Sequence, residues 1–150
     1  MINPIKLSDN YFIKKWLSER SEIKSSYEID GNIITNKGEA VRSKSEKIIA
    51  DILDKYGVPY KYEECLTFDD GSVVFPDFTI LDVKRRREVY LEHLGLMDNV
   101  EYVNRTMEKI KKYENNGIFP GVNLLITTES GNNKFNTKAF EKMISSWSEL

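Results

Sequence analysis

The sequence has little of the chemistry that several enzyme classes require. Its 150 residues include one cysteine and one histidine. A single cysteine excludes an internal disulfide and a cysteine-based zinc site. The absence of HExxH and GxSxG patterns argues against a zinc protease and a serine hydrolase. There is also no glycine-rich loop that would cradle phosphates, so an ATPase is not indicated.

Long hydrophobic runs are also absent. No segment approaches the roughly 18 apolar residues of a membrane-spanning helix, so no membrane partner is expected. Residues 1–6 lack the apolar core of a secretory signal, and the expected location is the cytoplasm. The net charge is −2 and the pI is about 5.6, which argues against a protein coated with positive charge for non-specific nucleic-acid binding. Any nucleic-acid contact would come from local patches.

The composition suits a soluble globular protein, with 40% hydrophobic and 31% charged residues. At this length we expect one domain over residues 1–150, with an N-terminal extension at 1–35, a core at 36–130 and a C-terminal helix at 131–150. Residues 1–28 suggest a polar helix, and Asp30-Gly31 is a hairpin signal.

Two helices and a group of strands make up the predicted core. Apolar residues recur at helical spacing over 43–56, where Ser43 to Glu46 forms a capping-box pattern. Strands predicted at 59–68, 73–81 and 88–94 form an antiparallel meander. A second helix is predicted over 99–115, with Val103, Met107 and Ile110 facing inward.

A short, nearly continuous apolar strand follows at 122–128, as expected for a buried central strand, and a last amphipathic helix is predicted at about 140–147. The order predicts an α/β fold: an αβββαβ core with a mixed central sheet flanked by helices.

Acidic residues stand at unusual places in this core. Asp77 follows Pro76 in the middle of a predicted strand, and Glu92 lies within the next one. Proline is tolerated at a strand start, edge or bulge, and such an irregularity could aim Asp77 towards Glu92. Two carboxylates that close repel each other unless one is protonated or a cation bridges them, and Mg²⁺ suits this geometry. Because strand side chains alternate, the His93 side chain points away from Glu92, but its backbone carbonyl could still reach a shared metal.

Three segments together resemble the PD-(D/E)xK nuclease superfamily. They are Gly38 to Glu46, then Pro76-Asp77, then Glu92-His93-Leu94-Gly95, which is similar to the branch with an EHLG-type strand. The resemblance spans residues 34–128. It implies a restriction-endonuclease-like fold and cleavage of DNA, or less often RNA, with Mg²⁺ or Mn²⁺. The products would carry 5′-phosphate and 3′-hydroxyl ends.

The resemblance also implies roles for individual residues. Asp77, Glu92 and the His93 backbone carbonyl would hold the metal, with Glu46 binding it directly or through water. The superfamily's lysine normally stands two positions after the glutamate, where this chain has Leu94. In the similar branch the following helix supplies it, four positions before a tyrosine, which points to Lys109. Lys111 and Lys112 are alternatives.

Several simpler interpretations stay open. Glu46 could be only the carboxylate of a capping box, or Glu39 could take its place. Glu63 suits a cross-strand ion pair or the edge of the site, and His93 suits a structural role. Arg42, Ser43, Lys44 and Ser45, at a helix N-terminus, are candidate nucleic-acid contacts. The charged turn at 84–87 is either a backbone contact or a solvated turn.

The sequence therefore predicts a Mg²⁺-dependent endonuclease that acts on DNA in preference to RNA. The alternative is a catalytically inactive module of the same fold that binds nucleic acid or a protein, an alternative that Leu94 keeps open. A homodimer is a further expectation, since many small nucleases of this fold pair to cut two strands.

Overall fold

The centre of the molecule is a four-stranded mixed sheet. The computed structural model describes residues 8–149, and side chains as far as residue 147. The sheet order is β3 (Tyr60–Tyr62), β6 (Phe78–Asp82), β7 (Arg87–Leu94) and β8 (Leu124–Thr128). The first three strands are antiparallel neighbours, and β8 runs parallel to β7.

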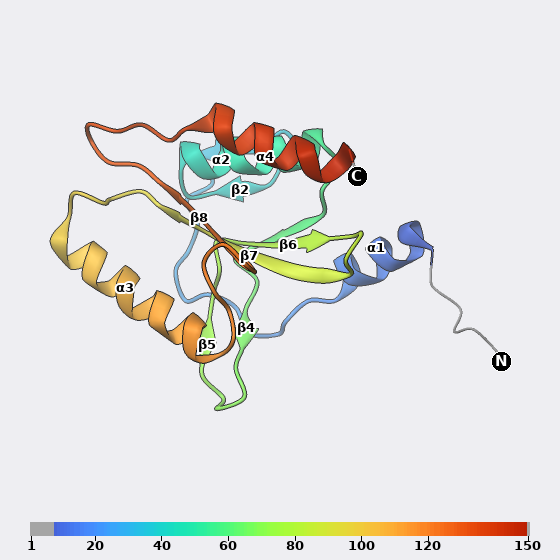
Figure 1. Ribbon diagram of the computed structural model, residues 1–150, viewed down its shortest axis with the longest axis horizontal. Coiled ribbons are helices and arrows are strands. Elements are labelled where there is room, and N and C mark those ends of the chain that lie inside the picture. The colour runs from blue at the N-terminus through green and yellow to red at the C-terminus, as the bar shows by residue number, and fades with distance from the viewer. Residues whose placement is uncertain (1–7, 150) are drawn as a thin grey trace.

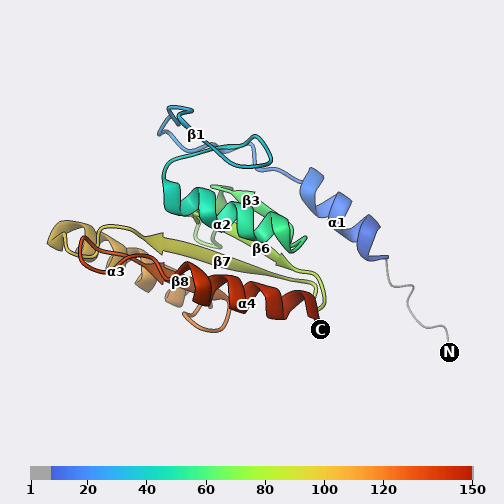
Figure 2. The ribbon, with the colours of Figure 1, turned by 90° about the horizontal axis from the view of Figure 1, so that it is seen from above.

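Helices cover both faces of this sheet. Helices α2 (Lys44–Lys55) and α4 (Thr137–Glu149) lie over one face, and α3 (Val100–Asn115) lies over the other (Figures 1 and 2). The order α2-β3-β6-β7-α3-β8 is the predicted αβββαβ core, so the predicted fold class is confirmed. No helix in the described part of the chain is long and apolar enough to cross a bilayer.

Strand alternation divides the apolar core into two parts. Phe78 and Leu91 point to the face under α2 and α4, where they pack in one cluster with Ile49 and Phe140. Tyr90 lies in a second cluster, which also contains Tyr113 of α3. Because Glu92 is two positions after Tyr90, it points towards α3, while His93 points towards α2 and α4.

The start of α2 follows the prediction from the sequence. Ser43 is the N-cap, and its Oγ accepts a hydrogen bond of 3.1 Å from the backbone N–H of Glu46. The helix is followed by Gly57, whose φ of 65° suits glycine. This cap fixes the first turn of α2, which contains Glu46.

Two of the predicted strands are each broken into two. Segment 59–68 contains β3 and then β4 (Leu66–Thr67), and segment 73–81 contains β5 (Val73–Val74) and then β6. Glu63, with a φ of 49°, interrupts the first, and Pro76, which has no N–H for a ladder, interrupts the second. β4 and β5 pair only with each other. The break leaves Asp77 just before β6, at an end of the main sheet.

The predictions for β8 and for α3 are also corrected. β8 is an edge strand rather than a central one, and its apolar run reflects packing on both faces, since Leu124 and Leu125 belong to different clusters. In α3, Met107 is 50% exposed, whereas Tyr113 is fully buried. Met107 is therefore the wrong member of the predicted inward stripe, whereas Val103 and Ile110 are partly buried. Lys109 and Tyr113 also face the sheet, where both contact Glu92.

The hairpin near the N-terminus is also displaced from its predicted position. It pairs β1 (Ile33–Ile34) with β2 (Ala40–Val41), and its turn contains Gly38 with a φ of 88°. Asp30-Gly31 precedes the hairpin instead, where the Asp30 side chain accepts a hydrogen bond from the Asn32 N–H and forms a local turn.

The N-terminal helix α1 (Asp9–Ser18) is shorter than the predicted helical stretch of 1–28, of which residues 1–7 lie outside the described residues. Two hydrogen bonds are among the contacts that attach this segment to the sheet. Trp16 Nε1 donates to Glu88 at 3.1 Å, and the buried Lys61 donates to the Glu19 carbonyl at 2.6 Å.

Candidate functional site

A pocket of about 270 Å³ opens between α3 and the ends of β6 and β7. Two acids and a lysine meet there. The pocket-lining residues that matter most are Asp77, Glu92, Tyr102, Arg105, Lys109 and Tyr113. Thus the structure brings three of the four predicted catalytic residues together.

Glu92 is held from α3 by two donors. Lys109 Nζ lies 2.7 Å from Glu92 Oε1, and the Tyr113 hydroxyl donates to the same oxygen at 2.6 Å. Glu92 is only 5% exposed, so these contacts offset the cost of burying its charge. Neither uses Oε2. Lys109 also donates to the Phe75 carbonyl at 3.2 Å.

Asp77 is a buried acid of the site with a strongly shifted pKa. Its Oδ2 accepts a hydrogen bond of 2.7 Å from the His93 backbone N–H. Burial of the carboxylate raises the pKa of Asp77 well above its ordinary value, and the charge of Glu92 raises it further. Lys109 and the hydrogen bond from the His93 N–H lower the pKa of Asp77, but the pKa stays raised overall. The ionised form of Asp77 is therefore disfavoured in the folded protein when no cation lies beside it.

This pair fits a hard divalent cation. Mg²⁺ is commonly held by one or two carboxylates and keeps several waters, so a complete protein cage is not needed. Within residues 8–149, no three His, Cys, Asp or Glu side chains gather into a group that could hold a metal ion. Asp77 and Glu92, with the His93 carbonyl, are the groups that could hold the cation.

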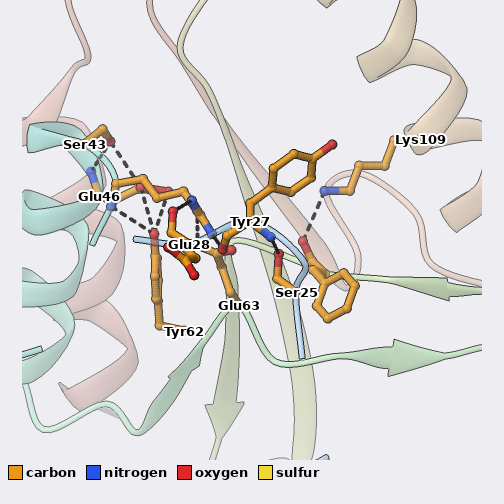
Figure 3. A network of polar contacts seen from close by, with 10 residues as sticks. Ser25, Tyr27, Glu28, Ser43, Glu46, Tyr62, Glu63 and Lys109 are labelled. Carbon is orange, nitrogen blue, oxygen red and sulfur yellow. Dashed lines mark hydrogen bonds and ion pairs between the residues drawn. The ribbon is translucent and has the colours of Figure 1, made fainter. Parts of the chain in front are cut away.

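Glu46 approaches from the other layer of the molecule. It is 7% exposed, and its carboxylate accepts hydrogen bonds from the Tyr62 hydroxyl at 3.1 Å and from Ser43 Oγ at 3.3 Å. Burial raises its pKa. Its charge contributes to the raised pKa of Asp77, but Glu46 does not line the pocket of Asp77 and Glu92. In the view of Figure 3, Glu46 and Lys109 lie on opposite sides of Tyr27.

The alternatives to these residues have other contacts. Glu39 accepts a hydrogen bond from the Tyr60 hydroxyl at 2.9 Å, and Glu63 pairs with Arg42 at 2.6 Å. Lys112 donates to the Val73 carbonyl at 3.2 Å, and Lys111 is exposed. Lys109 is the one of the three lysines that contacts Glu92 in the described structure.

The predicted nucleic-acid contacts differ in their surroundings. The Arg42 guanidinium donates to Glu63 and to the carbonyls of Tyr27 and Glu28, so each of its three nitrogens makes a hydrogen bond within the protein. Ser43 Oγ caps α2, and Lys44 is exposed.

In the charged turn, Arg85 and Arg87 both pair with Asp82, and Arg86 pairs with Asp9. The turn lies at the far end of the β6–β7 pair from Asp77.

A polar cluster behind the acids was missed by sequence reasoning. His93 Nε2 lies 2.6 Å from Glu129 Oε1, which also accepts a hydrogen bond from Ser45, and His93 Nδ1 lies 2.8 Å from Thr127. The hydrogen bond from Ser45, followed by the one from His93, lowers the pKa of Glu129. The cluster ties the start of α2 to β7. No sequence signal connects residues so far apart in the chain.

The contact between Tyr113 and Glu92 gives a stability prediction. Tyr113→Phe removes a buried hydroxyl that donates to a charged oxygen, so we expect the free energy of unfolding to fall by about 1.5–3 kcal/mol. Urea denaturation of the metal-free protein measures this. The matched control is Tyr11→Phe, at a tyrosine that is 56% exposed. Equal stability of the two variants would contradict a structural role for the hydroxyl.

Comparisons with known proteins gave few matches. No family model matches the sequence. Uncharacterized protein MJ1519 of Methanocaldococcus jannaschii is 36% identical over 86 residues, which are 57% of this chain and 7% of that protein. Among solved structures, a chain of the DrdV–DNA complex, determined by cryo-electron microscopy, is similar over 95% of this chain and 14% of its own length, with 16% identity and a TM-score of 0.44. This chain thus spans only a small part of both proteins.

Proposed function

We propose that this protein is a divalent-metal-dependent nuclease that hydrolyses phosphodiester bonds, most readily those of DNA. The observation that carries the proposal is the meeting of Asp77, Glu92 and Lys109 in one pocket, with Lys109 only 2.7 Å from Glu92. The resemblance to the PD-(D/E)xK superfamily supports DNA over RNA. Cutting of two strands by a homodimer, and a cytoplasmic location, are further predictions from the sequence.

Asp77, Glu92 and the His93 carbonyl would hold Mg²⁺ or Mn²⁺, and Glu46 would act from the other side through a water. Such a cation polarises a phosphoryl oxygen and lowers the pKa of a bound water. The acids are fixed before any ligand arrives, because Tyr113 and the His93 N–H orient them. This preorganisation reduces the rearrangement that substrate binding must drive.

Lys109 has a separate role in this mechanism. An ammonium group has three donor protons, and Glu92 and the Phe75 carbonyl accept from two of them. The third is available to a phosphate oxygen or to the attacking water. Lys109 would therefore orient that water or stabilise the negative charge that develops on the phosphate, in place of the lysine that Leu94 replaces.

Cleavage of a substrate panel tests the proposal. Single-stranded, double-stranded and branched DNA and RNA are incubated with Mg²⁺, Mn²⁺ or chelator, beside the Asp77→Asn variant. We expect cutting that requires the metal and is lost in the variant. Metal-independent cutting, or equal cutting by the variant, would contradict the proposal. Binding of nucleic acid without any cutting would favour the inactive module.

A further inference from the structure

A second hollow, of about 580 Å³, is lined by Lys109 and other residues of α3. It shares Arg105 and Lys109 with the pocket of the two acids. The other lining residues used here are Tyr27, Glu63, Glu108 and Lys112. Whatever occupies this hollow therefore lies directly beside the proposed reaction centre.

Tyr27 is an exposed aromatic residue in this hollow. Its exposed fraction is 77%, the highest among the exposed large hydrophobic side chains of the described residues. Within residues 8–149, its hydroxyl makes no hydrogen bond, and its ring has no aromatic or cation–π partner. Folding therefore gains little from this ring, which is left largely exposed at the hollow.

The backbone beneath the ring is fixed by Arg42. The guanidinium donates to the Tyr27 carbonyl at 2.6 Å and to the Glu28 carbonyl at 2.9 Å (Figure 3). Its Nε donates to the Glu63 carboxylate at 2.6 Å. The Tyr27 N–H donates to Ser25 Oγ at 3.3 Å. The segment is thus anchored while the ring stays exposed. A ring presented in this way loses little conformational entropy when a ligand stacks on it.

Helix α3 contributes three cationic residues, Arg105, Lys109 and Lys112, to the hollow that Tyr27 lines. Arg105 and Lys112 have no carboxylate partner within 4 Å in the described part of the chain, while Lys109 is paired with Glu92. Of the two acids in the hollow, Glu63 is neutralised by Arg42, and Glu108 is the other. An aromatic ring beside cations is a combination typical of sites for single-stranded nucleic acid. The ring stacks on the face of a base, and the cations attract the phosphates of the backbone.

We propose that this hollow binds an unpaired nucleotide next to the scissile phosphate, with its base stacked on Tyr27 and its phosphates near Arg105 and Lys112. The inference rests on the proposed function and extends it, since it makes the preferred substrate single-stranded or locally unpaired. Within a regular duplex the bases are stacked on one another and cannot reach the ring.

Binding of fluorescent oligonucleotides in chelator, where no cutting occurs, tests this inference. Tyr27→Ala is expected to weaken binding of a short single strand about 5- to 100-fold, while Tyr27→Phe, which keeps the ring, binds like the wild type. Duplex binding is expected to be unchanged. The matched control is Tyr11→Ala, because Tyr11 is also an exposed tyrosine, at 56%, but lies on α1. Both positions are exposed, so neither substitution should impair folding.

An oligonucleotide with abasic sites separates stacking from other losses. The wild type and Tyr27→Ala should bind it equally, because no base is present to stack. If Tyr27→Ala binds the normal strand like the wild type, or loses as much on the abasic strand, the inference is wrong while the nuclease proposal stands. If the wild type binds and cuts no nucleic acid, both fall together.

Discussion

Asp77→Asn is expected to abolish cleavage and, in chelator, to make the protein more stable than the wild type. The loss of rate should be at least about a thousandfold, since a metal contributes several kcal/mol of transition-state stabilisation and each 1.36 kcal/mol corresponds to a factor of ten. The gain in stability follows from removing a buried carboxylate that stands against Glu92. For a chain of this size, each kcal/mol raises the melting temperature by about 2–4 °C.

The pH dependence of this gain has a definite sign. Burial and Glu92 raise the pKa of Asp77 in the folded protein, so the folded state holds its proton more tightly than the unfolded state. Asp77 therefore costs the wild type no stability below the ordinary aspartate pKa, and the cost grows as the pH rises towards the raised value. In chelator, the advantage of Asp77→Asn should be small in acid and should increase with pH.

Manganese should reverse the order of the two proteins. A ligand at a hundred times its dissociation constant stabilises the folded state by about 2.7 kcal/mol, and the variant has lost one of the carboxylates that would bind it. The control is Asp69→Asn, an exposed acid in the turn between β4 and β5. If Asp77→Asn melts like the wild type in chelator at every pH, the electrostatic account of the pair is contradicted.

The second large effect is expected at Lys109. Lys109→Met should reduce the cleavage rate about 10²- to 10³-fold, the usual cost of losing one preorganised electrostatic group. Metal affinity should be retained or increase, because the variant removes a positive charge 2.7 Å from Glu92. Cleavage kinetics and Mn²⁺ titration together separate this outcome from the loss of a metal ligand.

The matched control for this prediction is Lys111→Met, an exposed lysine on the same helix. It should cut like the wild type. If Lys111→Met loses activity and Lys109→Met retains it, the assignment of the lysine is wrong. If Lys109→Met loses metal binding as well as activity, the prediction that Lys109 acts on the water or the phosphate, and not on metal binding, is wrong.

Local signals predicted the elements that carry the site. The Ser43 cap and the apolar spacing fixed α2, and strand parity placed Glu92 and His93 on opposite faces. Local pattern could not predict the break at Glu63, because its contacts, with the Asp77 carbonyl and with Arg42, come from distant parts of the chain. It also could not predict that Tyr62 would hold Glu46, since these residues are brought together only when α2 packs on the sheet.

Helix α3 shows the limit of apolar periodicity. The pattern of Val103, Met107 and Ile110 indicated a buried stripe, yet Met107 is 50% exposed. The fully buried residue of the helix is Tyr113, on the same side as Lys109. A polar stripe is turned inward here because Glu92 is a buried charged partner that accepts from both residues. The resemblance to a known family, rather than the hydrophobic pattern, pointed to this lysine as a candidate.

Calorimetric titration of Mn²⁺ into the wild type and into Glu92→Gln tests most directly whether Asp77 and Glu92 hold a divalent cation. Glutamine keeps the size of the side chain and an oxygen that can accept from Tyr113, but it removes the charge. We predict saturable binding to the wild type and loss of most of that affinity in the variant. No binding to the wild type, or equal binding to both proteins, would contradict the account.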